Sequence, residues 1–161
     1  MPGWLTALTF LTALGCGVIG GVFYAFSTFV MRALLRRPAA GAIAAMQAIN
    51  VTVINPLFLG PFLASAAAAA ALVAVALLRW AHAGSAWLLT GGLLYFAGTF
   101  GVTMLFNVPL NNVLEQIPPD APDAAEQWTH YAARWTTWNH VRTAAAIAAM
   151  AAFILALLAA P

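Results

Sequence analysis

The chain has 161 residues, of which 64% are hydrophobic and only 6% are charged. Soluble domains carry about 25% charged residues, so this composition excludes a soluble monomer and indicates an integral membrane protein. The formal net charge of +2 and the lack of a basic stripe argue against a nucleic-acid partner. The length favours a single domain over residues 1–161.

The first predicted membrane span covers residues 4–30. It contains no charged residue, and an apolar run of more than about 18 residues is long enough to cross a bilayer as an α-helix. Gly17 and Gly21 lie four residues apart within this run. Small residues at this spacing let two helices approach closely. The partner is either another helix of the same chain or a second copy, in a homodimer through the Gly17/Gly21 face.

A short helix and a second span follow the first. Arginines at positions 32, 36 and 37 end the first span, and Pro38 suits the first turn of a new helix. We therefore predict a short helix over residues 38–50. The apolar pattern then resumes, and the second span is predicted over residues 56–78.

The third and fourth spans are separated by the most polar part of the chain. The third span is predicted over residues 86–106, with Pro109 disturbing its end because proline has no backbone N–H. All four acidic residues lie in residues 113–126, together with three prolines, which indicates a loop. Asp120 is placed to cap a helix that begins at the next residue and continues into the fourth span, over residues 140–159.

The arginines predict how the spans are oriented. With four crossings, both long connections lie on one side, and the only arginine on the other side is Arg79. Because arginine is enriched in cytoplasmic loops, we predict a multi-pass protein of the inner (plasma) membrane with cytoplasmic long loops and both termini outside. The expected fold class is all-α: an integral membrane four-helix bundle with short additional helices on the cytoplasmic side.

Polar side chains gather at the cytoplasmic end of this predicted bundle. Thr99, Thr103, Asn107 and Asn111 follow one another at intervals of four, which places them on one helix face. Polar groups near the hydrocarbon are costly unless they are paired. The other spans and the short helix add polar residues at the same depth, namely Tyr24, Ser27, Thr28, Gln47, Asn50 and Asn55. This convergence predicts a pocket.

Arg142 lies at the start of the otherwise uncharged fourth span, after a stripe of aromatic residues that includes Trp135 and Trp138. Such a stripe favours packing or interfacial anchoring, but it also suits a pocket wall. The partners open to Arg142 are neighbouring amides such as Asn139, helix carbonyls, a tryptophan face, or an anionic ligand. His140 is two residues from Arg142, or about 200° around a regular helix, so these two side chains do not face the same point.

Five short segments of the chain resemble the sequence motifs of a known protein family. They are residues 23–27 (FYAFS), 46–50 (MQAIN), 55–58 (NPLF), 106–111 (FNVPLN) and 135–142 (WTTWNHVR). Together they resemble the anthrone oxygenase-like family, in its bacterial branch. The resemblance implies a four-helix membrane protein, and its fungal members are implicated in oxidising anthrones to anthraquinones with molecular oxygen, without a metal or flavin. It also implies that the site is lined by Asn107, Asn111, Trp135, Asn139 and Arg142.

The first functional hypothesis is a cofactor-independent membrane oxygenase acting on a flat, lipophilic, phenolic substrate of the anthrone type. Arg142 would hold the developing oxyanion, with amides as further donors. Either His140 or Tyr24 would accept the proton. Expected catalytic residues are Arg142, His140, Asn107 and Asn139, and expected substrate-binding residues are Tyr24, Gln47, Asn50, Asn55, Asn111, Trp135 and Trp138.

Two other hypotheses stay open at the level of sequence. The chain could be a non-catalytic binding protein or partner subunit in the bilayer, with the polar cluster fixing helix packing. It could also be a haem protein that uses His140. Because histidines do not occur in pairs at ligand spacing, no metal site is predicted. The expected partners are the lipid bilayer and a small lipophilic ligand.

Overall fold

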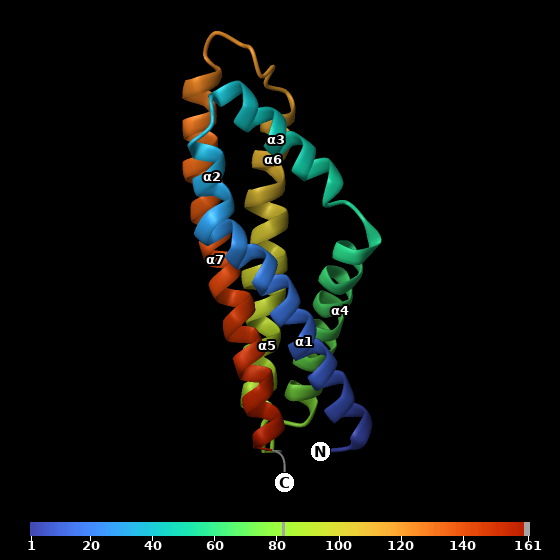
Figure 1. Ribbon diagram of the computed structural model, residues 1–161. Coiled ribbons are helices and arrows are strands. Elements are labelled where there is room, and N and C mark those ends of the chain that lie inside the picture. Colours follow the sequence, from blue (N-terminus) through green and yellow to red (C-terminus); the bar gives the residue numbers. More distant parts are fainter. Residues whose placement is uncertain (82, 160–161) are drawn as a thin grey trace.

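The computed structural model describes residues 1–81 and 83–159, and Figure 1 shows its long helices lying along one another. In this part of the chain, four helical segments are long and apolar enough to cross a membrane: Gly3–Leu35, Pro56–Leu78, Ser85–Glu115 and Ala124–Leu158. A shorter helix, α3, covers Ala39–Thr52. The predicted all-α, multi-pass fold with four spans is therefore confirmed. The predicted end of the domain at residue 161 lies outside the described residues.

The four segments alternate in direction. The N-terminus, the last turn of α7 (Ala124–Leu158), the end of α4 (Pro56–Leu78) and the start of α5 (Ser85–Leu93) lie at one end of the bundle, which we call the terminal end (Figure 1). The two long connections lie at the opposite end, which we call the loop end. Helix α7 (Ala124–Leu158) packs against α1 (Gly3–Ala25) and α5, and α3 crosses the loop end to reach α4.

Two of the four segments contain wide π-helical turns. In the first, η1 (Phe26–Val30) joins α1 to α2 (Met31–Leu35). In the third, η2 (Leu94–Gly101) and η3 (Thr103–Asn107) join α5 to α6 (Val108–Glu115). The third helix therefore continues past Pro109, beyond the end at residue 106 that its sequence predicts. Proline is tolerated there because it falls in the first turn of α6, directly after the π-helical turns.

The start of the last helix also differs from the prediction. Helix α7 begins at Ala124 rather than at residue 121, and Asp123 precedes it without capping its backbone. The Asp123 carboxylate instead accepts a hydrogen bond of 2.6 Å from Gln127 Nε2. At 35 residues, α7 is about 52 Å long at 1.5 Å per residue, well beyond a hydrocarbon core of about 30 Å. The bundle therefore has a section that extends past the bilayer.

Two separate hydrophobic cores hold the bundle together. The core towards the terminal end joins α1, α4, α5 and α7 around residues such as Ile19, Leu72 and Phe153. The core at the loop end lies beneath α3, around residues such as Ile43 and Leu114. Helices α2, α6 and α7 meet α3 in this second core.

The two glycines of the predicted Gly17/Gly21 face lie in different surroundings. A methyl group added at Gly17 would lie 2.9 Å from the Met150 sulfur on α7, whereas one added at Gly21 would meet nothing within 4 Å. Gly17 thus serves packing within the chain, and Gly21 faces outward. The homodimer stays a prediction.

Candidate functional site

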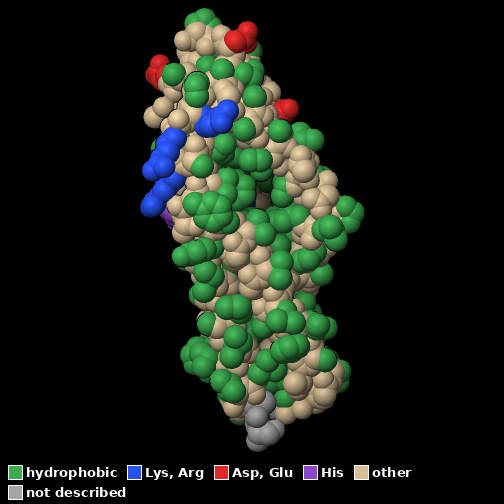
Figure 2. Space-filling model, in the orientation of Figure 1, with side chains coloured by type: hydrophobic (Ala, Val, Ile, Leu, Met, Phe, Trp, Pro, Cys, Tyr) green, Lys and Arg blue, Asp and Glu red, His purple; other side chains and the backbone are tan. Residues whose placement is uncertain are grey.

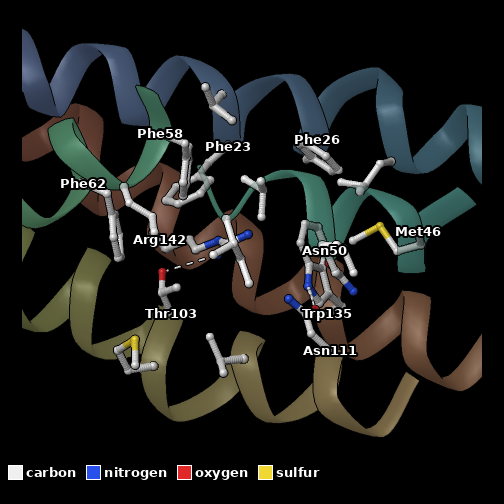
Figure 3. Close-up of a pocket in the computed structure, with 18 of the residues that line it drawn as sticks. Phe23, Phe26, Met46, Asn50, Phe58, Phe62, Thr103, Asn111, Trp135 and Arg142 are labelled. Atoms are coloured by element: carbon white, nitrogen blue, oxygen red, sulfur yellow. Dashed lines mark hydrogen bonds between the residues drawn. The ribbon is translucent and has the colours of Figure 1, made fainter. Parts of the chain in front are cut away.

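A cavity of about 510 Å³ lies between the two hydrophobic cores, on the loop-end side of the bundle (Figure 3). Aromatic side chains form much of its wall, and these are Phe23, Phe26, Phe58, Phe62 and Trp135. Its polar wall residues are Asn50, Thr103, Asn111, Asn112, Glu115 and Arg142. The cavity is thus a largely apolar slot with a few polar groups, which is the usual character of a small-molecule site.

The cavity opens through the side of the bundle. Its wall includes Val22, Val51 and Ile54, whose side chains are 37%, 63% and 69% exposed. Figure 2 shows a hollow in this face, bordered by hydrophobic side chains, with the acidic groups above it and arginine side chains above it and to its left. A lateral opening of this kind connects the cavity with the exposed apolar side of the bundle.

Arg142 is the cation of the cavity, and it is almost completely buried, with 6% of its surface exposed. Its guanidinium carbon lies 3.8 Å from the centre of the Phe23 ring and 4.9 Å from that of Trp135, so both rings make cation–π contacts with it. The Nη1 atom donates a hydrogen bond of 3.3 Å to the Thr103 hydroxyl (Figure 3). All of these partners are neutral, so the positive charge is shielded but not cancelled.

Asn139 holds Arg142 in position. Its Oδ1 atom accepts two hydrogen bonds from the guanidinium, 3.0 Å from Nε and 2.8 Å from Nη2. Its Nδ2 atom donates to the Phe23 backbone carbonyl at 2.8 Å and to the Ser27 hydroxyl at 2.7 Å. Asn139 therefore ties Arg142 to the start of η1, but it does not itself line the cavity. The three bonds that Arg142 donates do not use every guanidinium N–H, which leaves donors for a ligand.

Asn111 and Trp135 form a second polar group in the cavity wall, near Asn50 (Figure 3). Asn111 Oδ1 accepts hydrogen bonds from Trp135 Nε1 at 2.8 Å and from the Tyr131 hydroxyl at 3.0 Å. These bonds fix the indole plane. Asn107 is fully buried and donates to the Trp135 carbonyl at 3.2 Å, so it supports the wall from behind.

Two predicted binding residues lie outside the cavity and stabilise helix ends. Gln47 on α3 donates from Nε2 to the carbonyls of Leu114 and Ile117, at 2.9 and 3.0 Å, which closes the end of α6. Asn55 caps α4, because its Oδ1 accepts hydrogen bonds from the N–H groups of Leu57 and Phe58.

His140, Tyr24 and Trp138 also lie away from the cavity. The side chains of His140 and Tyr24 are exposed on the outside of the bundle. Trp138 stacks on Phe106 with ring centroids 3.7 Å apart. As the helical spacing predicts, His140 and Arg142 face different directions. The structure therefore brings neither predicted proton acceptor to the cavity, and haem ligation by His140 stays a prediction.

Sequence reasoning missed several wall residues. Phe58 and Phe62 look like ordinary lipid-facing residues of an apolar helix, and only the tertiary packing turns them inward. Glu115 is different, because it continues the interval of four that runs from Thr99 through Asn111. This interval of four residues is the sequence signal that predicts Glu115 as a wall residue.

The match with a known family covers much of this site. The family model of anthrone oxygenase matches residues 54–152, more than half of the chain. The chain belongs to the anthrone oxygenase family. The matched part contains Asn111, Trp135, Asn139 and Arg142, and it leaves out α1 and α3, which close the cavity from the other side. No curated protein and no solved structure matches the chain.

Proposed function

We propose that this member of the anthrone oxygenase family oxidises a flat, lipophilic, phenolic substrate of the anthrone type with molecular oxygen, without a bound metal or flavin. The observation that carries the proposal is the environment of Arg142. A buried cation with neutral partners and free N–H donors faces an aromatic slot, and an anion with a flat ring system complements both features.

The chemistry requires little from the protein once the substrate is bound. An anthrone that loses a proton from its acidic carbon becomes a delocalised anion, with much of the charge on its carbonyl oxygen. Arg142 would donate hydrogen bonds to this oxygen and stabilise the anion. The anion passes one electron to oxygen, and the resulting radical and superoxide combine to a peroxide that loses water. Trp135 and Phe23 would hold the rings in place.

The lateral opening supports a substrate dissolved in the membrane. Val51 and Ile54 at the edge of the opening are apolar and exposed, so an entering ligand meets no polar barrier. A flat phenolic compound partitions into a bilayer, and a cavity that opens onto lipid receives it without passage through water.

The arginines support the proposed orientation. Arg32, Arg36, Arg37 and Arg134 lie near the loop end, with Arg79 near the terminal end. Arg142 is buried in the bundle and so does not belong with the loop charges. We therefore place the loop end in the cytoplasm and both termini outside the inner membrane.

The non-catalytic alternative also has an observation in its favour. Asn107, Asn139, Gln47 and Asn55 all make hydrogen bonds within the chain, so part of the polar cluster serves packing. A binding protein or partner subunit with this cavity would bind a lipophilic ligand and release it unchanged.

Oxygen uptake separates the two functions. Purified protein is reconstituted in liposomes and supplied with 9-anthrone in air-saturated buffer, and oxygen consumption and anthraquinone are measured together. An oxygenase consumes oxygen faster than empty liposomes and produces anthraquinone in the same proportion. A rate equal to that of empty liposomes would contradict the proposal for this substrate class and favour the binding protein.

Trp135 should contribute to binding whereas Trp138 should not. The probe is 9-anthracenecarboxylate, a fluorescent, unreactive tricyclic anion that resembles the deprotonated anthrone. Loss of the aromatic contact in Trp135→Ala is expected to weaken its binding about 10-fold, the equivalent of about 1.4 kcal/mol. Fluorescence titration in liposomes measures this. Trp138→Ala is the matched control, because Trp138 stacks on Phe106 outside the cavity. Equal losses in the two variants would remove Trp135 from the binding site.

A further inference from the structure

Oxidation of an anthrone needs a proton acceptor, and the cavity wall offers one on α6. Of the described side chains that line the cavity, Glu115 is the one carboxyl group and Arg142 is the one basic side chain, so Glu115 is the group that can accept a proton. His140 and Tyr24 lie outside. Glu115 is also exposed, so a proton that it accepts can exchange with water at the loop end.

Arg142 and Glu115 line the cavity at different heights along the bundle. Thr103, which binds Arg142, and Glu115 are twelve residues apart on one continuous helical segment, which is at most about 18 Å at the α-helical rise of 1.5 Å per residue. Side chains on a helix lean towards its N-terminus. Because α6 and α7 run in opposite directions, Glu115 leans towards Thr103 and Arg142 leans towards the loop end, and their charged groups are closer than their backbones.

The chemistry of the substrate fits this arrangement. In an anthrone the carbonyl oxygen and the acidic CH₂ group lie on opposite edges of the central ring. When the oxygen is bound by Arg142 and the short axis of the ring system, from the carbonyl oxygen to the CH₂ group, lies along the slot, the CH₂ group points towards Asn111 and Glu115. The group that must lose a proton thus faces the end of the cavity that holds a carboxylate.

We propose that Glu115 is the proton acceptor of the reaction, an inference that rests on the proposed function. The Glu115 carboxylate takes a proton from the substrate CH₂, and the electron pair of that C–H bond delocalises onto the oxygen held by Arg142. The anion gives one electron to O₂, and the radical and superoxide join in a C–O bond. The peroxide anion takes the proton back from Glu115. The hydroperoxide then loses its remaining C–H hydrogen and its terminal OH as water, so CH₂ and O₂ become C=O and H₂O.

An anaerobic exchange experiment tests this step without oxygen. Wild type in liposomes is mixed with 9-anthrone in D₂O under nitrogen, and loss of the CH₂ proton signal is followed by NMR. Glu115→Gln is expected to slow protein-dependent exchange and, in air, oxygen uptake by about 100-fold. Binding of 9-anthracenecarboxylate should remain close to wild type, which shows that the variant is folded. Glu115→Asp should restore part of both rates.

The control is Glu126→Gln, because Glu126 is an exposed acid in the first turn of α7 that does not line the cavity. This variant should catalyse exchange of the substrate CH₂ protons, and consume oxygen, at the wild-type rates. Protein-dependent exchange in Glu115→Gln at the wild-type rate would overturn the assignment of Glu115 and leave the oxygenase proposal intact. If the wild-type protein catalyses proton exchange but does not take up oxygen, the oxygenase proposal is overturned. In that case, loss of the exchange in Glu115→Gln would still support Glu115 as the proton acceptor.

Discussion

Replacement of Arg142 by alanine is expected to lower anthrone-dependent oxygen uptake by about 100- to 1000-fold, the usual effect of removing a preorganised group that stabilises an oxyanion. The anion that reacts with oxygen has its charge at the point where Arg142 donates. Without the guanidinium, that charge would be buried among Phe23, Trp135 and Phe62 with no cationic partner. Oxygen uptake in liposomes measures the effect.

Binding data show whether the charge or the shape has been lost. Arg142→Ala should abolish saturable binding of 9-anthracenecarboxylate while leaving that of the uncharged 9-methylanthracene close to wild type. Arg134→Ala is the control, because Arg134 is an exposed arginine on the same helix, outside the cavity. Arg142→Lys keeps the charge but not the planar, forked donor group, so it should fall between wild type and alanine. Full oxygen uptake in Arg142→Ala would exclude the proposed role.

Replacement of Asn139 by leucine should cause the largest loss of stability, about 3 kcal/mol of unfolding free energy. Leucine has a similar size but cannot accept the two hydrogen bonds from Arg142 or donate to Phe23 and Ser27. The variant keeps a buried charge whose main neutral partner is gone. Reversible unfolding in mixed micelles, followed by circular dichroism, gives the free energy.

A double variant tests the cause of that loss. Asn139→Leu combined with Arg142→Leu removes the charge together with its partner, so it should be more stable than Asn139→Leu alone. The surface variant Gln116→Leu is the control for adding leucine to a polar position, and it should remain close to wild type, because Gln116 is exposed and does not line the cavity. A double variant less stable than Asn139→Leu would show that Asn139 acts through something other than Arg142.

The elements of this fold follow closely from the sequence. Long uncharged runs define the spans because hydrocarbon tolerates little else, and Pro38 and Asn55 mark helix starts by their backbone chemistry. The convergence of Asn50, Asn111 and Arg142 also follows, because alternating spans place the polar ends of all helices at one end of the bundle. These features depend on local composition or on topology, which a sequence displays directly.

The direction of individual side chains was harder to predict. A step of four residues advances about 40° beyond a full turn in an α-helix, so a regular helix would rotate the stripe from Thr99 to Asn111 away from one face. The wide turns η2 and η3 offset this rotation, and Thr99, Thr103 and Asn107 are all buried. Sequence patterns do not reveal π-helical turns, because the same residues also fit regular α-helix.

The separation of Asn139 and Trp138 from the cavity has a similar origin. Periodicity places them on the same broad face as Arg142, but it cannot say which part of that face meets the slot and which meets a neighbouring helix. Asn139 turns towards η1, and Trp138 turns towards Phe106. Only the packing of α7 between the other helices decides this.

Isotope labelling tests the central claim most directly. Liposomes containing the protein are supplied with 9-anthrone under ¹⁸O₂, and the anthraquinone is analysed by mass spectrometry over time beside empty liposomes and Arg142→Ala. We predict that anthraquinone carrying a single ¹⁸O atom from the gas accumulates far faster with the wild-type protein than in either control. Labelled product that forms no faster with wild type than in empty liposomes would contradict the proposed oxygenase.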